Sequence, residues 1–177
     1  KFADKAGEFT LLKNNDGKYF TFAEYKELVA ANQTDKDGNI IMLYTNDPVS
    51  QDSFIAAARD RGYDILVMDG NLDNHYISYL ENKNEKCKFV RVDSDVIDKL
   101  IRKDEDKPMA LSTDQQNFIR PLFETVLPAD DKTHFNVTFE PLSGEESPVL
   151  ITQNEFMRRM KEMSQMGGSP YAFYGQM

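Results

Sequence analysis

The sequence has little of several residue types on which enzymes often depend. It contains one cysteine, two histidines and no tryptophan among 177 residues. A single cysteine, Cys87, cannot form an internal disulfide, and its neighbours predict a small buried side chain rather than a reactive thiol. His75 and His134 lie in different predicted domains, without Cys or His at metal-ligand spacing, and no Cys-x-x-Cys pair is present. The sequence therefore indicates no zinc site, catalytic triad or thioredoxin-like redox motif.

Basic charge and long apolar runs are also scarce. Thirty acidic residues against 21 basic ones give a formal net charge of -9, which repels phosphate groups, so nucleic acid and anionic membranes are not expected partners. No run approaches the ~18 apolar residues that span a bilayer, and no signal-like segment opens the chain. We therefore expect a cytoplasmic protein. Because the chain starts at Lys1 without an initiating methionine, we also expect a piece of a longer protein.

What is present is a clear pattern of alternating strands and helices. Residues 1–38 are predicted to form a helical lead-in, within which Thr21 and Glu24 have the spacing of a capping box. Three strand–helix repeats follow over 39–103, and the first two strands are almost continuously apolar, as in a parallel sheet with helices on both faces. The predicted fold class is therefore α/β, a three-layer αβα unit with a short parallel βαβαβα sheet. The expected strands are 40–45, 63–69 and 87–92, and the expected helices are 49–61, 73–82 and 95–102.

A charged, helix-breaking run over 104–111 predicts a linker. Beyond it, residues 112–177 are predicted to form a smaller α+β domain. Ser112 and Gln115 again have capping-box spacing, for a helix that Pro121 either kinks or delays. In the second case the helix begins near Arg120.

Two strands and one helix are expected in the rest of this domain. Alternation of apolar and polar residues over 135–139 predicts a strand with one solvated face. A strand over 148–152 is expected to pair with it. An amphipathic helix over 153–166 is predicted to follow.

Aspartates stand where the predicted parallel strands end. Ligands of α/β sheets bind at the carboxyl ends of the strands, and a rim of Asp47, Asp69 and Asp93 could hold Mg²⁺ in a small α/β enzyme or a phospho-acceptor domain. The alternative is that Asp47, Asp73 and Asp93 cap the helices that follow them. Helix capping is the preferred interpretation. No glycine-rich phosphate-binding loop follows any strand.

The last predicted helix carries an unusually wide apolar surface. At ~100° per residue its apolar side chains cover about half of the helix, more than a core contact requires. Methionine is flexible and polarizable, so such a surface can adapt to different apolar partners. Burial in the core or in a subunit interface explains the pattern equally well, whereas a membrane-surface helix is disfavoured by the net negative charge. The residues concerned are Phe156, Met157, Met160, Met163 and Met166.

Several strings of the sequence resemble the ninety-kilodalton heat-shock chaperone family over essentially the whole chain. They are IIMLYTND (40–47), the helix–strand repeats of 52–95, and SPVLITQNEFMRRMKEMSQM (147–166). The resemblance identifies 39–103 as the small subdomain of the family's middle domain. It identifies 112–177 as the first part of the C-terminal domain, without its dimerisation helices.

The resemblance also implies a function. In this family ATP and Mg²⁺ are bound in regions that have no counterpart in this chain, so we expect no enzymatic activity, no catalytic residue and no cofactor or metal in this segment. The expected partners are non-native client proteins and, for the parent protein, a second copy in a homodimer. Client binding would involve His75 and Tyr76 on one helix and the methionine-rich helix. A structural spacer that only transmits motion remains an alternative.

Overall fold

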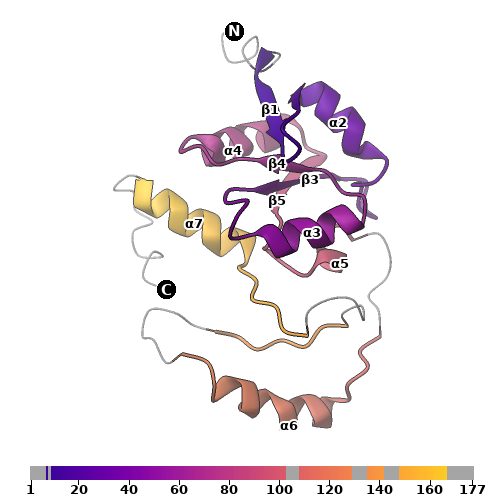
Figure 1. Ribbon diagram of the computed structural model, residues 1–177, viewed down its shortest axis with the longest axis vertical. Helices are drawn as coiled ribbons and strands as arrows, with labels where there is room; N and C mark the ends of the chain where they lie inside the picture. Colours follow the sequence, from indigo (N-terminus) through magenta and orange to yellow (C-terminus); the bar gives the residue numbers. More distant parts are fainter. Residues whose placement is uncertain (1–6, 8, 103–107, 129–134, 142–147, 167–177) are drawn as a thin grey trace. The chain divides into compact units, whose positions relative to one another are not determined.

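The computed structural model describes residues 7, 9–102, 108–128, 135–141 and 148–166 of the chain (Figure 1). The chain divides into two compact units. The first contains residues 1–104 together with 149–155, and the second contains residues 105–148 together with 156–177.

The first unit is built on a five-stranded mixed sheet. Its strands are β1 (Leu11–Asn14), β2 (Tyr19–Thr21), β3 (Ile40–Thr45), β4 (Ile65–Val67) and β5 (Cys87–Arg91), in the order β2-β1-β4-β3-β5. β3 pairs in parallel with both β4 and β5, which confirms the predicted parallel βαβαβ arrangement. β1 pairs antiparallel with β2 and β4.

The β1–β2 hairpin replaces part of the predicted helical lead-in, so the expectation for residues 11–21 was wrong. The turn is closed by Asn14, whose side-chain oxygen accepts hydrogen bonds from the amides of Asp16 and Lys18 over 3.1 and 2.9 Å. Gly17 adopts a φ of 78°, which is accessible to glycine at little cost. These local bonds favour a turn over a helix at this point.

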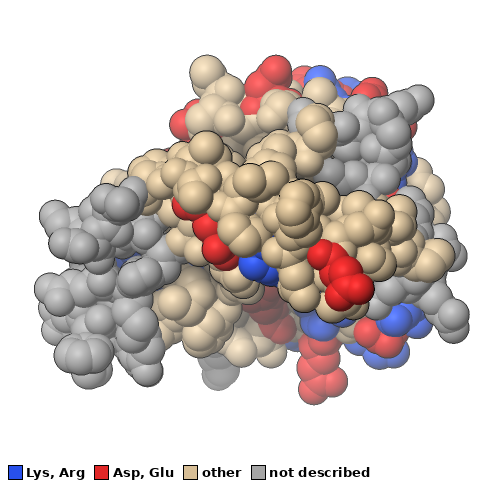
Figure 2. All heavy atoms as spheres, turned by 90° about the horizontal axis from the view of Figure 1, so that it is seen from below, with Lys and Arg blue, Asp and Glu red and all other residues tan. Residues whose placement is uncertain are grey.

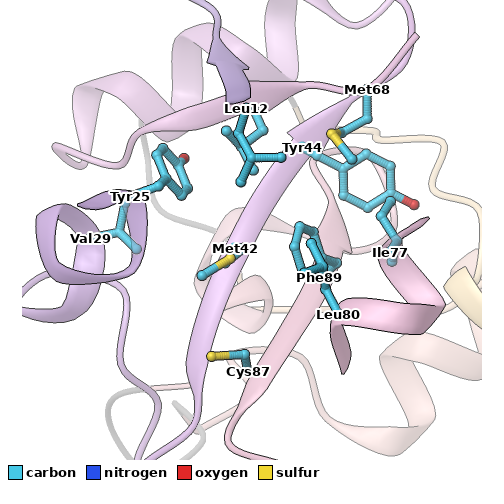
Figure 3. Packing of buried hydrophobic residues seen from close by; sticks show 11 residues of the cluster. Leu12, Tyr25, Val29, Met42, Tyr44, Met68, Ile77, Leu80, Cys87 and Phe89 are labelled. Carbon is cyan, nitrogen blue, oxygen red and sulfur yellow. The ribbon is translucent and has the colours of Figure 1, made fainter. Parts of the chain in front are cut away.

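Helices cover both faces of the sheet, as the sequence predicted. α2 (Phe22–Ala30) and α4 (Asp73–Lys83) lie on one face, and α3 (Asp52–Asp60) and α5 (Ile97–Leu100) lie on the other (Figure 1). Successive residues of β3 enter the two cores in turn, because side chains alternate along a strand. Met42 and Tyr44 pack with α2 and α4 (Figure 3), whereas Ile41 and Leu43 pack with α3 and α5.

The predicted helix-end signals are confirmed only in part, because no side chain among the described residues caps the N-terminus of α3, α4 or α5. Thr21 and Glu24 form the predicted capping box of α2. Gly62 follows α3 with a φ of 73°, a conformation in which a side chain would be strained.

The second unit contains α6 (Thr113–Glu124), which begins at the predicted capping box of Ser112 and Gln115. Pro121 lies within this helix, so of the two alternatives the late start near Arg120 was wrong. Once the cap has fixed the first turns, the hydrogen bond that Pro121 cannot donate interrupts the helix without ending it. No residue of α6 is buried, and uncharged side chains predominate on the face seen in Figure 2.

The two strands predicted for the second domain are not formed. Residues 135–141 and 148–154 have neither helical nor strand structure. Residues 149–155 instead belong to the first unit, so the alternating stretch has no partner strand there. It contacts α6 through Arg120, which donates to the Val137 carbonyl and lies over the Phe139 ring, 5.4 Å from its centroid.

The final helix, α7 (Glu155–Met166), agrees with the predicted amphipathic helix. Within the described part of the chain, no helix combines the length and the apolar character needed to cross a membrane.

Candidate functional site

The start of α7 presents apolar side chains to solvent. Phe156 is 68% exposed and Met157 is 43% exposed, whereas Met160 is half-buried. Phe156 and Met160 are four residues apart and therefore share one helix face. Met163 and Met166 lie on the described backbone of α7, but their side chains fall outside the described part. The arrangement offers an apolar surface at the start of α7, and its role in client binding stays a prediction.

The two predicted client residues of α4 have different environments. His75 is exposed. Tyr76 is half-buried, packs against the core, and stacks on Tyr79 with 6.2 Å between the ring centroids and 17° between the ring planes. His75 is thus the residue of this pair that is open to a partner, whereas Tyr76 also contributes to packing. The residues of α4 and the apolar residues of α7 belong to different compact units.

The aspartates at the strand ends are engaged in local hydrogen bonds and an ion pair. Asp47 accepts from the amides of Val49 and Ser50 over 3.1 and 3.2 Å, and hydrogen bonds from Ser50 lower the pKa of its carboxyl. It therefore caps the turn before α3, not the helix itself. Asp73 accepts from the amide of Gly70 over 2.9 Å, outside α4, so the prediction that it caps this helix was wrong.

For Asp93 the predicted helix cap was wrong, because its carboxylate pairs with Arg91. Among the described residues, no three or more His, Cys, Asp or Glu side chains come together in a group that could hold a metal ion. The interpretation as a Mg²⁺-dependent enzyme or phospho-acceptor with Asp47, Asp69 and Asp93 is therefore not supported.

The carboxyl ends of β3 and β5 carry a buried polar network instead. Arg91, whose side chain is 8% exposed, donates through Nε and Nη2 to the two carboxylate oxygens of Asp93. Gln51 Nε2 donates to the same carboxylate over 2.9 Å, and Thr45 Oγ1 donates to Gln51 Oε1 over 2.6 Å. Arg91 Nη1 also reaches Asn46 Oδ1 at 3.3 Å. Buried charges need such partners, because an unpaired one costs several kcal/mol.

Two residues of the segment 149–155 complete this network. The amide of Gln153 donates to the carbonyl of Asp93 over 3.1 Å, and Gln153 Oε1 accepts from Arg91 Nη2 over 3.3 Å. Glu155 bridges two strands: its Oε1 accepts from the Tyr44 hydroxyl over 2.8 Å, and its Oε2 accepts from the Arg91 amide over 3.3 Å. The chain's own segment therefore contacts the strand ends at which α/β sheets usually bind ligands.

Sequence reasoning missed this network. One signal was available, because Arg91 is a charged residue in a strand of a predicted parallel sheet with both faces covered, and a buried charge requires a partner. The identity of the partners, 62 and 64 residues further along the chain, has no local signature.

Cys87 agrees with its predicted role. It is 2% exposed and packs in the core near Met42 and Phe89 (Figure 3). Burial raises the pKa of its thiol, which disfavours the reactive thiolate.

Comparison with known proteins relates the chain to one group of chaperones. It is 48% identical over 176 residues to the chaperone protein HtpG of Bacteroides thetaiotaomicron, which covers 99% of this chain and 26% of that protein. It is also 48% identical over 177 residues to HtpG of Porphyromonas gingivalis, covering 100% of this chain and 26% of that protein. HtpG of Bacteroides fragilis strain YCH46 gives the same identity as the first of these.

No model of a protein family and no solved structure matches the chain. The chain spans about a quarter of the length of the relatives it matches. Nearly half of its residues are identical to theirs, from one end of the chain to the other. The chain is therefore homologous along its whole length to a segment of the HtpG chaperones, which belong to the family that its sequence strings resemble.

Proposed function

We propose that this chain is a chaperone segment that binds non-native client proteins and connects the other parts of a longer HtpG-like protein. The client surface consists of the apolar residues of α7, with His75 and Tyr76 of α4 as a second contact. The proposal assigns this segment no reaction of its own. ATP and Mg²⁺ would be bound elsewhere in the parent protein, which would act as a homodimer.

The exposure of Phe156 and Met157 is the observation that supports client binding most directly. Exposing large apolar side chains costs solvation free energy, of the order of 25 cal/mol per Å² left uncovered. Groups of such residues at a surface mark interaction sites more often than chance. A flexible thioether next to a rigid aromatic ring suits partners of varied shape, which is what a protein that binds unfolded chains requires.

The experiment is a client-aggregation assay with the whole chain. A reporter enzyme is unfolded by heat, and light scattering records its aggregation with and without the chain. We expect the double variant Phe156→Ser/Met157→Ser to lose most of the suppression, because it removes the exposed apolar surface of α7. The variant His75→Ser is expected to weaken suppression less, because it changes one exposed side chain.

A matched control removes exposed apolar surface elsewhere. Leu28 on α2 and Val49 before α3 are 52% and 88% exposed, and neither belongs to the proposed client surface. The double variant Leu28→Ser/Val49→Ser should suppress aggregation as well as the unaltered chain does. Equal suppression by all variants would contradict the client surface on α7 and leave the spacer interpretation.

A further inference from the structure

The segment 149–155 occupies the strand ends without burying much apolar surface. Val149 and Ile151 are 58% and 74% exposed and Leu150 is half-buried, so burial of apolar area contributes only modestly to holding the segment. The polar bonds of Gln153 and Glu155 carry the attachment instead. Because only a few hydrogen bonds hold the segment, the loss of one of them should weaken its attachment to the sheet.

We propose that Tyr44, Arg91, Gln153 and Glu155 form an intramolecular latch that holds the start of α7 on the α/β unit. Its occupant is the chain's own segment, seated where a parallel sheet would otherwise take a small ligand. The significance of the latch for client binding rests on the proposed function, because α7 is the proposed client helix.

The position of Glu155 explains why the latch matters for α7. Glu155 is the first residue of that helix, and its carboxylate joins the Tyr44 hydroxyl on β3 to the Arg91 amide on β5. A helix of 12 residues is marginal by itself in water and frays from its ends. Anchoring its first residue removes one fraying end, so the latch keeps the first turn of the helix formed.

Tyr44 and Glu155 can each be changed at the latch bond without altering the packing of the sheet. Tyr44 is 1% exposed and is part of the core with its ring (Figure 3), whereas its hydroxyl reaches Glu155. Tyr44→Phe therefore removes the latch bond and retains the packing. Glu155→Gln keeps the shape of the side chain and removes its charge. Both changes leave the side chains of Arg91 and Asp93 in place, whose loss would leave a buried charge without its partner.

The experiment measures amide hydrogen exchange by NMR in the whole chain and in both variants. We expect the protection of the Gln153 amide to fall by roughly 10- to 100-fold in each variant, the factor that corresponds to one hydrogen bond with a charged group. Amides in the second half of α7 should lose protection as well. Amides of β3 and β4 should keep theirs, because the sheet does not depend on the latch.

The double variant tests whether the two residues act together. If Tyr44 and Glu155 share one bond, the combined loss is smaller than the product of the two single losses. Tyr19→Phe and Glu27→Gln provide the matched control, since both residues are exposed and lie outside the latch. This pair should change neither the protection of Gln153 nor that of α7.

Two results would overturn the latch. Unchanged protection of Gln153 and α7 in both variants would mean that the bonds hold nothing. A loss of protection throughout β3 and β4 would mean that the groups are ordinary core contacts that cannot open separately. Hydrogen exchange is measured without a client, so the two proposals fail separately. If Phe156→Ser/Met157→Ser retains full suppression of aggregation, the client surface is refuted and the latch is not. If the exchange results contradict the latch, the client surface is not affected.

Discussion

The side chain of Gln33 links β3 to the residue that precedes β4. It is 1% exposed and lies between α2 and β3. Its Nε2 donates to the carbonyl of Ile41 over 2.8 Å, and its Oε1 accepts from the amide of Asp64 over 2.6 Å. One amide group thus satisfies a buried acceptor on β3 and a backbone donor just before β4.

Replacing Gln33 by Met should destabilise the first unit strongly. Methionine has nearly the same length, so packing is retained while both backbone groups lose their partner. Each unsatisfied buried group costs about 1–3 kcal/mol, so the expected loss for the two groups is about 2–6 kcal/mol. Against a total stability of about 5–15 kcal/mol for a domain, this is a large fraction.

Gln33→Glu adds a pH dependence with a defined sign. A carboxylate can still accept from the Asp64 amide, but it faces the Ile41 carbonyl without a proton to donate. The protonated acid restores both bonds, so the pKa of the introduced glutamate is raised in the folded state above the ~4.3 of the unfolded chain. The stability of this variant should be fully present below that unfolded pKa and fall as pH rises through the folded one.

Urea unfolding, followed by circular dichroism and by hydrogen exchange of the β3 amides, measures both effects. Glu27→Met is the matched control, because it places the same side chain at an exposed position of α2 and should shift stability by less than about 0.5 kcal/mol. A loss of less than about 1 kcal/mol for Gln33→Met would refute the reasoning that these two groups depend on Gln33. A Gln33→Glu variant whose stability relative to the unaltered chain rises between pH 4 and pH 7 would refute the pH argument.

Two further predictions concern single sites. Because burial raises the pKa of the Cys87 thiol, an aromatic disulfide reagent at pH 8 should react with the native chain far more slowly than with the urea-unfolded chain. Stability should decline as pH rises above the ordinary thiol pKa of ~8.5, and Cys87→Ala should remove this decline. Gly62→Ala should cost about 1 kcal/mol in urea unfolding. Gly62 has a φ of 73° and the new Cβ would lie 3.9 Å from Asn32 Nδ2, so the cost is backbone strain and not a clash.

The part of the fold that could be predicted is the part with strong local patterns. The first two parallel strands were recognised because they are nearly all apolar, as strands covered on both faces are, and the two capping boxes because their residues are three positions apart. β1 and β2 have only four and three residues, too few for alternation to be distinguished from a helical pattern. The Asp16-Gly17 pair before Lys18 was the turn signal that could have revealed the hairpin.

For the candidate site, too, the local pattern could be predicted from the sequence and the exposure of the side chains could not. The wide apolar surface of α7 follows from residue spacing alone, since Phe156 and Met157 are neighbours at the start of a helix whose period is known. Whether such a surface is covered depends on what packs on it, which spacing does not encode. The exposed fractions of these two side chains had to come from the structure.

The polar network illustrates why a boundary in sequence need not be a boundary in space. The charged run after Arg102 separates two regions by composition, and the first unit nevertheless includes residues 149–155. Arg91 and Asp93 are largely withdrawn from water at the ends of the sheet, so the groups that surround them must supply hydrogen bonds. Gln153 and Glu155 supply several of them, from far along the chain. The α/β unit is therefore defined by which buried polar groups form hydrogen bonds with one another. By that criterion the segment that leads into α7 belongs to the unit as much as the strands it contacts.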